Sequence, residues 1–368
     1  MIERIVFVWD NYGPTHVDRA KAVLDRFSKT HEVYFVELVA KSPLYGWEPP
    51  PDDFQKISLA AENKPNFFLD LFRLLRVVFR LGRGSYFLHS YNCLFIFTTA
   101  IVLNVLGSRV YHLNDSKFDD KQRSVFGELV KAVFKWPYRG ALVSGRRNAE
   151  YAIFHGISKQ RVAFGYNAIS VARVQAMAEA PPAPDGAPFD ARHFTCVARL
   201  VPKKNHAMLL QAYRLYCDQV EVPRPLHLCG SGPLEADLRR QVAALGLTDG
   251  VVFRGWVQDD EVSRTLAHTV ALLLPSTEEQ FGIAVIEAQA MGVPVILSDN
   301  CGARDSVIRT GVNGFVVEPD NPHGMAFFMA RLGEDEVLWR RMCGEALATA
   351  PLGDVQRFVE GVETLLSA

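Results

Sequence analysis

Short apolar runs alternate with longer segments of helical periodicity along the chain. In the first half, Ile5–Trp9 predicts a buried strand, Val17–Phe27 an amphipathic helix and Val33–Val39 a second strand. Further strands are expected at Tyr86–His89, Arg109–Leu113, Ala141–Ser144 and Ala163–Gly165. Because strands joined by helices pair in parallel and are covered on both faces, this pattern predicts an α/β, doubly wound domain.

The alternation stops at residues 176–192 and then starts again. This segment contains four prolines, which neither continue a helix nor fit a central strand, so we expect a linker. After it, strands are expected at Phe194–Ala198, Pro225–Leu228, Val251–Phe253, Val270–Leu274 and Val293–Leu297, and helices at Ala207–Tyr216, Leu234–Leu245 and Ile283–Met291. The sequence therefore predicts two doubly wound domains, residues 1–175 and 193–351, and the length of 368 residues suits both.

The last segment, residues 352–368, has helical periodicity. Its apolar positions include Val355, Phe358, Val362 and Leu365, which share one face of a helix. We expect an amphipathic helix at the end of the chain.

Charge is distributed unevenly, although the net charge is only -1. Residues 1–170 hold 23 Lys and Arg against 16 Asp and Glu, a surplus of +7, which leaves -8 for the remainder. A basic first half suits an anionic partner such as lipid headgroups or a phosphorylated acceptor, or it attracts the acidic half. The six cysteines are scattered without a CxxC pair, the first residues do not resemble a leader, and no apolar stretch is long enough to cross a bilayer. We therefore expect a cytoplasmic enzyme and no nucleic-acid partner.

The most informative motif lies between the strand ending at Leu274 and the strand beginning at Val293. It reads Glu279-Gln-Phe-Gly-Ile-Ala-Val-Ile-Glu287-Ala-Gln-Ala-Met-Gly-Val-Pro. The loop is expected at the carboxyl end of the sheet, where doubly wound domains bind ligands, and the following helix directs backbone N–H groups towards a phosphate. The plain alternative is a pair of solvated glutamates, but the Phe-Gly pair, Gly and Pro around them make the motif specific.

A second candidate site follows the first strand of the second domain. Arg199 and, five residues later, Lys204 stand at the carboxyl end of that strand. Two cations at this edge suit a leaving diphosphate, on which negative charge develops. A basic surface turn is the alternative interpretation of these residues alone.

Together these motifs resemble glycosyltransferase family 4. The resemblance implies a GT-B fold, with two Rossmann-like domains facing a cleft and a C-terminal helix that crosses back to the first domain. It implies that Glu287 holds the ribose, Glu279 contacts the transferred sugar and Arg199 with Lys204 clamps the diphosphate. The residues implied to line the donor pocket are Phe281, Gly282 and Ile283, the Gly230-Ser-Gly232-Pro turn, and Gly13 across the cleft.

The acceptor side of the first domain departs from the family. Many members carry a double glycine where this chain has Tyr12-Gly13-Pro14, and a turn with Thr15 as helix N-cap is an equal alternative for this loop. A family histidine near the transferred sugar has Asn114 or Asp115 in its place, and His89 is the other candidate for that role. His16, close after the Tyr-Gly-Pro loop, is a further acceptor-side candidate. We expect His112 to be buried.

The resemblance implies a retaining, metal-independent hexosyltransferase that moves sugar from a nucleotide-diphosphate-sugar to a glycan or lipid-linked acceptor, as in bacterial envelope polysaccharide synthesis. No cofactor is expected, and the chain has no Asp-x-Asp triplet of the metal-binding type. The alternatives are a catalytically silent GT-B scaffold subunit and a nucleotide-sugar epimerase or phosphorylase of the same architecture.

Residues 71–83 carry four arginines at helical spacing among bulky apolar residues: Arg73, Arg76, Arg80 and Arg83. This pattern predicts a basic amphipathic helix, which suits peripheral contact with an anionic membrane at the inner face of the cytoplasmic membrane. A partly buried helix with a solvated arginine face is the alternative.

Overall fold

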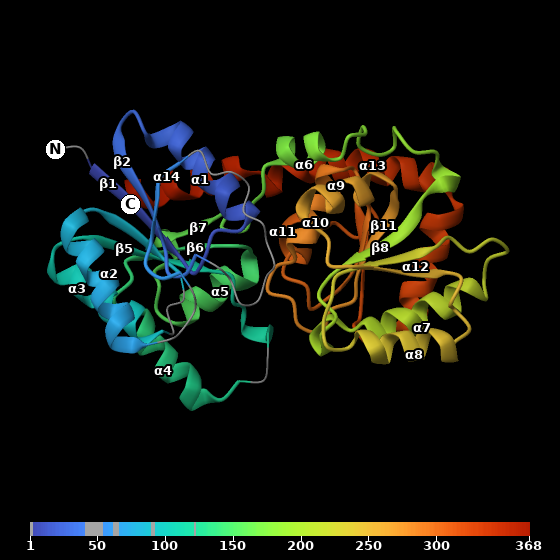
Figure 1. Ribbon diagram of the computed structural model, residues 1–368, viewed down its shortest axis with the longest axis horizontal. Coiled ribbons are helices and arrows are strands. Elements are labelled where there is room, and N and C mark those ends of the chain that lie inside the picture. The colour runs from blue at the N-terminus through green and yellow to red at the C-terminus, as the bar shows by residue number, and fades with distance from the viewer. Residues whose placement is uncertain (1–2, 41–53, 62–65, 90–92, 121–122) are drawn as a thin grey trace. The chain divides into compact units, whose positions relative to one another are not determined.

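The chain forms two compact α/β units, coloured along the sequence in Figure 1. The computed structural model describes residues 3–40, 54–61, 66–89, 93–120 and 123–368. Unit 1 is formed by described residues within 1–118, 122–168 and 355–368, and unit 2 by those within 119–121 and 169–354.

The described part of unit 1 contains a seven-stranded parallel sheet in the order β3-β2-β1-β4-β5-β6-β7. The strands are β1 (Glu3–Trp9), β2 (His31–Glu37), β3 (Lys56–Ser58), β4 (Ser85–Leu88), β5 (Arg109–Asn114), β6 (Gly140–Val143) and β7 (Val162–Phe164). The helices are α1 (Pro14–Phe27), α2 (Phe67–Leu81), α3 (Leu94–Val105), α4 (Val125–Lys135), α5 (Arg146–Phe154) and α14 (Val355–Ser367). β1 pairs with β2 on one side and β4 on the other, so the order of the strands reverses beside β1.

Each face of this sheet has its own apolar core. Alternate residues of β1, such as Phe7 and Val8, point to opposite faces, as expected for a strand. Phe7 packs with side chains of α1 and α14, whereas Val8 packs with side chains of α2, α3 and α5. Figure 1 shows α1 and α14 on one face of the sheet and α2, α3 and α5 on the other.

The predicted final helix is present, and it belongs to unit 1 although unit 2 precedes it in the chain. Phe358 of α14 is fully buried, with its ring 5.7 Å from that of Phe7 and 6.1 Å from that of Trp9. Tyr111 donates a hydrogen bond of 2.8 Å to the carbonyl of Leu365. A Cβ at Gly165 would lie 2.2 Å from the carbonyl oxygen of Arg357, so the close approach of β7 to α14 requires glycine. The predicted return of the last helix to the first domain is confirmed.

Unit 2 contains, within the described residues, a six-stranded parallel sheet in the order β10-β9-β8-β11-β12-β13. The strands are β8 (His193–Val197), β9 (Leu226–Cys229), β10 (Val251–Gly255), β11 (Thr269–Leu274), β12 (Val295–Ser298) and β13 (Gly314–Val317). The helices are α6 (Val171–Met177), α7 (His206–Cys217), α8 (Glu235–Ala244), α9 (Asp259–Ala267), α10 (Ile283–Ala290), α11 (Arg304–Val307), α12 (Pro322–Glu334) and α13 (Glu336–Thr349). Every residue of β11 is buried, as expected for a central strand covered on both faces.

The proline-rich segment 176–192 lies within unit 2, and the change of unit falls between Ala168 and Ile169. The buried Arg192 side chain holds this segment in place. Its guanidinium donates hydrogen bonds of 2.8 Å to the carbonyl of Asp185 and 3.0 Å to the carbonyl of Ala267, and it lies over the ring of Trp339. Residues 178–188 therefore have a fixed place in unit 2 without forming a helix or strand.

The prediction of two α/β, doubly wound domains is confirmed. The strand β3 was not predicted, because three residues are too few to show a period of two. Thr15 does not cap α1: the N-cap is Gly13, and the Thr15 hydroxyl accepts a hydrogen bond of 3.0 Å from Arg19 inside the helix. That alternative for the loop was wrong because Pro14 already occupies the first helical turn.

We predict that Phe358→Ala destabilises the protein by about 3–5 kcal/mol, because it removes a fully buried ring and leaves a cavity between α14 and the sheet. Urea unfolding measures the loss. Val337→Ala, at an exposed position of α13, is the control and should change the free energy of unfolding by less than about 0.5 kcal/mol. Equal effects of the two substitutions would contradict the docking of α14.

Candidate functional site

The predicted donor residues of unit 2 lie where the strand order reverses. β8 pairs with β9 on one side and with β11 on the other. The segments that follow β8 and β11 leave the sheet at its carboxyl edge, beside each other, and this is where open α/β sheets bind ligands. Arg199 and Lys204 follow β8, and Glu279 follows β11.

The loop that carries Glu279 is held by the segment after β12. The carbonyls of Glu279 and Phe281 accept hydrogen bonds from the N–H groups of Gly302 (3.1 Å) and Ala303 (2.8 Å). A Cβ at Gly302 would lie 1.9 Å from the carbonyl oxygen of Gln280, so the two segments can approach this closely only with glycine there. The loop therefore has a defined backbone before any ligand is considered.

Lys204 and Glu279 form a direct ion pair between the Nζ and Oε2 atoms, and both side chains are largely buried. The Ser276 hydroxyl lies 3.4 Å from the same carboxylate oxygen. Asn205, which has a left-handed backbone with φ of 57°, donates to the carbonyls of Pro275 (3.2 Å) and Pro319 (2.7 Å) and ties the turn after β8 to the loop after β11. The structure thus brings together two predicted residues that lie 75 positions apart.

Lys203, the residue before Lys204, pairs with Glu278 at 3.2 Å. Its carbonyl also accepts the N–H of Thr277 at 2.9 Å. Two adjacent lysines therefore form ion pairs with two adjacent glutamates, and the two pairs fix the loop after β8 against the loop after β11.

Arg199 is partly exposed, two residues beyond the end of β8. The turn carrying Gly230 and Gly232 packs against this segment. A Cβ at Gly230 would lie 2.1 Å from the carbonyl oxygen of Ala198, and one at Gly232 would lie 2.4 Å from that of Leu200. Both glycines are thus required by chain packing, and their predicted role in donor binding remains a prediction.

The remaining donor residues lie at the start of α10. Gly282 is the N-cap in a left-handed conformation with φ of 102°, and it has no side chain that could occupy the first N–H groups of the helix. The Phe281 side chain is part of the apolar core, so only its backbone can face a ligand. Ile283 begins the helix, and Glu287 is partly exposed one turn later. Arg199, Lys204 and the amino end of α10 together provide positive charge and N–H donors at one edge of the sheet, which suits an anion.

Unit 1 has its own point of strand reversal, where the segments after β1 and β4 leave the sheet. His89 follows β4 directly, and its Nδ1 atom lies 3.5 Å from a carboxylate oxygen of Asp10, which follows β1. Burial lowers the pKa of His89, but Asp10 and Asp115 outweigh burial, so the pKa lies above its usual value. Asp10 was not predicted as a site residue, although a carboxylate directly after a buried strand was a usable signal.

His16 lies in the same region, on the first turn of α1. Burial, followed by the positive charges of Arg19 and His89, holds the pKa of His16 well below its usual value, so the ring is neutral at pH 7. Within the described part of the chain, the Nδ1 atom of His16 and the hydroxyl of Tyr12 are buried and have no hydrogen-bond partner. Residues 90–92, which follow His89, lie outside the described residues.

The two candidates at the end of β5 differ in surroundings. The Asn114 side chain is buried and satisfied locally, because its amide donates to the carbonyl of Ser116 at 3.2 Å and its oxygen accepts the N–H of Ser116. Asp115 is partly exposed and close enough to raise the pKa of His89. Of the acceptor-side candidates, the structure groups His16, His89 and Asp115. The backbone of Gly13 has φ of -88°, which any residue can adopt, so its conformation does not explain the glycine.

Solved structures share the fold of the whole chain. HepE from Anabaena, crystallised with UDP and glucose, superposes with a TM-score of 0.76 at 17% identity and covers 100% of both chains. TarM superposes with a TM-score of 0.77 at 11% identity, covering 100% of this chain and 99% of the other. The fold is therefore the GT-B fold of glycosyltransferases.

Residues 182–347, most of unit 2, match the family "Glycosyl transferases group 1". The chain is 31% identical over 173 residues to D-inositol 3-phosphate glycosyltransferase of Streptomyces griseus, covering 45% of this chain and 36% of the relative. It is 29% identical over 147 residues to O-antigen chain mannosyltransferase B of Escherichia coli, covering 40% and 38%. The chain thus spans little more than a third of the length of these relatives.

We predict that Asp10→Asn lowers the pKa of His89, because the carboxylate that favours the charged ring is removed. A raised pKa in the folded state means that this pair stabilises the fold at low pH and loses its effect as pH rises through the pKa of His89. The destabilisation by Asp10→Asn should therefore be larger at pH 5 than at pH 8.

NMR titration of the histidine Cε1–H signals, assigned with His89→Asn, measures the pKa directly. Asp25→Asn, at an exposed position of α1, is the matched control. If the His89 titration is the same in both variants, the ion pair with Asp10 is refuted.

Proposed function

We propose that this protein is a glycosyltransferase that takes its sugar from a nucleotide-diphosphate-sugar bound to unit 2. The observation that carries the proposal is the contact between Lys204 and Glu279 at the point of strand reversal, inside the group 1 domain. The cations and the helix N-terminus at this sheet edge suit the diphosphate of such a donor, and the carboxylates of Glu279 and Glu287 suit the hydroxyls of its sugar and ribose.

In the proposed complex Glu287 accepts hydrogen bonds from the ribose hydroxyls and Glu279 from the sugar. Lys204 and Arg199 bind the diphosphate, so Lys204 exchanges part of its interaction with Glu279 for the ligand. The cost of separating this pair is offset by the two negative charges of the diphosphate. HepE, which shares the fold, was crystallised with UDP-glucose, and this supports a nucleotide-sugar as the donor class.

The proposed reaction retains the anomeric configuration and uses neither metal ion nor cofactor. The acceptor oxygen attacks the anomeric carbon on the face from which the diphosphate leaves, and the electron pair of the broken C–O bond stays on the diphosphate. The proton of the acceptor hydroxyl passes to that departing oxygen. Arg199, Lys204 and the N–H groups of α10 stabilise the charge that develops on the leaving group.

We place acceptor recognition on unit 1, with His89, His16, Asp115 and Asn114 as the candidates, and Gly13 beside the donor phosphate. Asp10 and Asp115 favour a protonated His89, which can donate hydrogen bonds to an anionic or hydroxyl-rich acceptor. We propose a glycan or lipid-linked acceptor of a bacterial envelope polysaccharide, met at the cytoplasmic face of the membrane. The resemblance to O-antigen chain mannosyltransferase B supports this class.

We predict that Lys204→Ala and Glu279→Gln each lower donor turnover about 100-fold or more, because each removes a group that stabilises the transition state. Release of free nucleoside diphosphate from UDP-, GDP- and ADP-sugars measures turnover. Lys203→Ala is the matched control, since its ion pair with Glu278 lies beside the site, and it should retain most of the activity. EDTA should leave the rate unchanged, and NMR of the first product should show the donor's anomeric configuration.

A wild-type protein that turns over none of these donors but still binds one in a thermal-shift assay would favour the silent scaffold. Release of an epimerised nucleotide-sugar, without diphosphate, would favour the epimerase. Full activity of Lys204→Ala would contradict the proposed leaving-group role.

We also propose that α2 contacts an anionic membrane. A helix is present in the predicted segment but ends at Leu81, so Arg83 lies just beyond it. Its exposed face carries Phe68, Phe72 and Phe79 beside the exposed Arg76 and Arg80. Among the described helices none is long and apolar enough to cross a bilayer, so the proposed contact is peripheral. Aromatic rings in the headgroup region and arginines near lipid phosphates are typical of such helices.

We predict that replacing Arg76, Arg80 and Arg83 by Gln weakens binding to vesicles containing phosphatidylglycerol about 100-fold, at about 1 kcal/mol for each basic residue. Binding of the wild type should fall as salt is raised. The same change at Arg331, Arg340 and Arg341, exposed on α12 and α13, is the control for net charge and should have little effect. Equal losses in the two triple variants would contradict a specific role of α2.

A further inference from the structure

Helix α4 is oriented with its charged face inward and its apolar face outward. The side chains of Val125 and Phe126 are 81% and 78% exposed, and that of Trp136, the residue directly after the helix, is 76% exposed. By contrast, the charged side chains of Glu128 and Lys135 are only 6% and 1% exposed. The other exposed apolar side chains of the helix are Leu129, Val130 and Val133. At 100° per residue, these apolar positions fall on one face and the charged positions on the opposite face. An amphipathic helix of a water-soluble domain normally has the reverse orientation.

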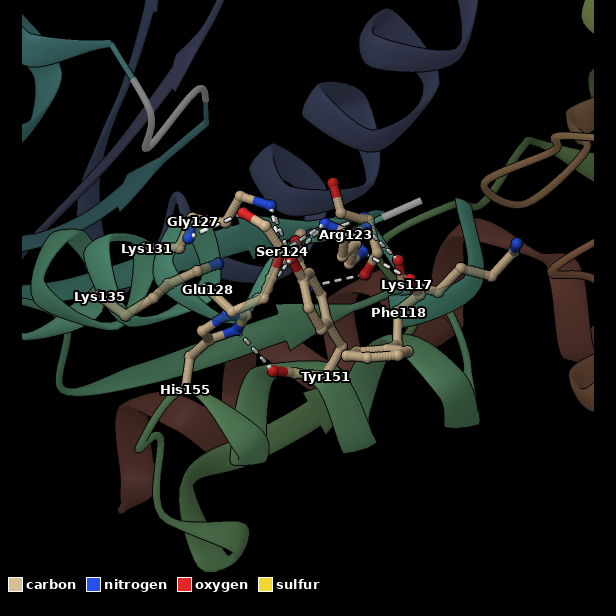
Figure 2. A network of polar contacts seen from close by, with 12 residues as sticks. Lys117, Phe118, Arg123, Ser124, Gly127, Glu128, Lys131, Lys135, Tyr151 and His155 are labelled. Carbon is tan, nitrogen blue, oxygen red and sulfur yellow. Dashed lines mark hydrogen bonds and ion pairs between the residues drawn. The ribbon is translucent and has the colours of Figure 1, made fainter. Parts of the chain in front are cut away.

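The inward face is held by a network of polar contacts around Glu128 (Figure 2). The Glu128 carboxylate accepts hydrogen bonds from Lys131 (2.7 Å) and Tyr151 (2.8 Å), and the Nε2 atom of His155 lies 2.9 Å from it. Arg123 lies 3.3 Å from the same carboxylate and over the ring of Tyr151. Four side chains thus provide partners to the buried Glu128 charge, and two of them, Tyr151 and His155, belong to α5 and its C-cap and join α4 to that helix.

A second buried contact fixes the far end of the helix. The Nζ atom of Lys135 lies 2.7 Å from the Nδ1 atom of His112 in β5. Phe134 packs on Phe97 of α3 with a ring separation of 4.7 Å. Rotating α4 to bury its apolar face would expose these pairs and break the contacts to α3, α5 and β5. The outward apolar face is therefore part of the folded structure of unit 1.

Two further aromatic side chains of unit 1, Phe118 and Phe154, are also exposed, and their rings lie 5.9 Å apart. An exposed apolar face such as that of α4 is uncommon on a monomeric soluble domain and marks a contact with another apolar phase or partner.

We propose that the outer face of α4 inserts into the headgroup region of an anionic bilayer, with Phe126, Leu129 and Trp136 reaching the acyl chains. The helix has 11 residues, so it would lie in the plane of the bilayer, which is where amphipathic helices with an outer tryptophan are stable. The inference adds to the contact proposed for α2: the inserted apolar side chains are those of α4, whereas the cations are supplied by α2. It does not depend on the glycosyl transfer.

Charge complementarity favours a bilayer over a protein partner. α2, α3 and α5 cover the same face of the sheet of unit 1, and α4 packs between α3 and α5. The outer surfaces of α2 and α4 thus belong to one layer, in which the arginines of α2 supply the cations that anionic headgroups require. Residues 1–170 carry the positive surplus of the chain.

Tryptophan fluorescence tests the insertion directly. Vesicles of phosphatidylcholine and phosphatidylglycerol with brominated acyl chains should quench the wild-type protein, and Trp136→Phe should remove most of that quenching while binding is retained. Trp256→Phe, in unit 2, is the matched control and should leave the quenching unchanged. If Trp136→Phe is quenched as strongly as the wild type, Trp136 does not reach the acyl chains and the proposal is overturned.

Co-sedimentation with the same vesicles tests the apolar face as a whole. Phe126→Glu should weaken binding at least about tenfold, because a charge replaces a ring that the bilayer would bury. Val337→Glu, at an equally exposed apolar position of unit 2, should bind as the wild type does. If Phe126→Glu is folded and binds vesicles as the wild type does, the proposal is overturned. It is also overturned if the wild type is a dimer in solution that Phe126→Glu converts to a monomer while vesicle binding is unchanged. If the α2 triple variant binds vesicles weakly but Trp136 is still quenched at high protein concentration, the insertion of α4 does not require the arginines of α2, which supports the proposal for α4.

Discussion

Parallel pairing of every described strand is the constraint on which both units depend. A parallel strand must return through a crossover, so helices cover both faces of each sheet and all carboxyl ends meet at one edge. Where the order reverses, two of those ends diverge and leave room for side chains. This one rule places Lys204 against Glu279 in unit 2 and Asp10 against His89 in unit 1. The same geometry thus positions the candidate residues of each unit.

The candidate donor residues of unit 2 could be predicted from the sequence because the patterns that indicate them are local. The strand before Glu279 is a continuous apolar run, the helix after it begins at a glycine, and the order of these elements defines the sheet edge. The ion pair itself required only that two loops follow neighbouring strands. The pair between Asp10 and His89 was not predicted, because neither residue has a motif and their contact depends on the pairing of β1 with β4. Gly230 and Gly232 were assigned to ligand approach, yet the structure shows that chain packing already requires them.

The orientation of α4 could not have been predicted from periodicity. The spacing of its residues defines an apolar and a charged face but does not say which one turns inward, and the usual rule would bury the apolar face. The outcome was decided by residues far away in sequence, His112, Tyr151 and His155, which offer partners to Glu128 and Lys135. A buried charge with several partners is tolerated, whereas an outward apolar face implies an environment less polar than water.

The position of α14 has a consequence for how the protein is made. Its side chains Phe358, Val362 and Leu365 complete the apolar core over β1, β5 and β6, but the ribosome adds them only after the whole of unit 2. During translation α1 already covers part of that face, but the part that α14 covers stays exposed until after all the described strands of unit 2 have been made. Unit 2 can therefore be the first to reach its final structure even though it begins later. The segment most recently synthesised then closes the domain that was started first.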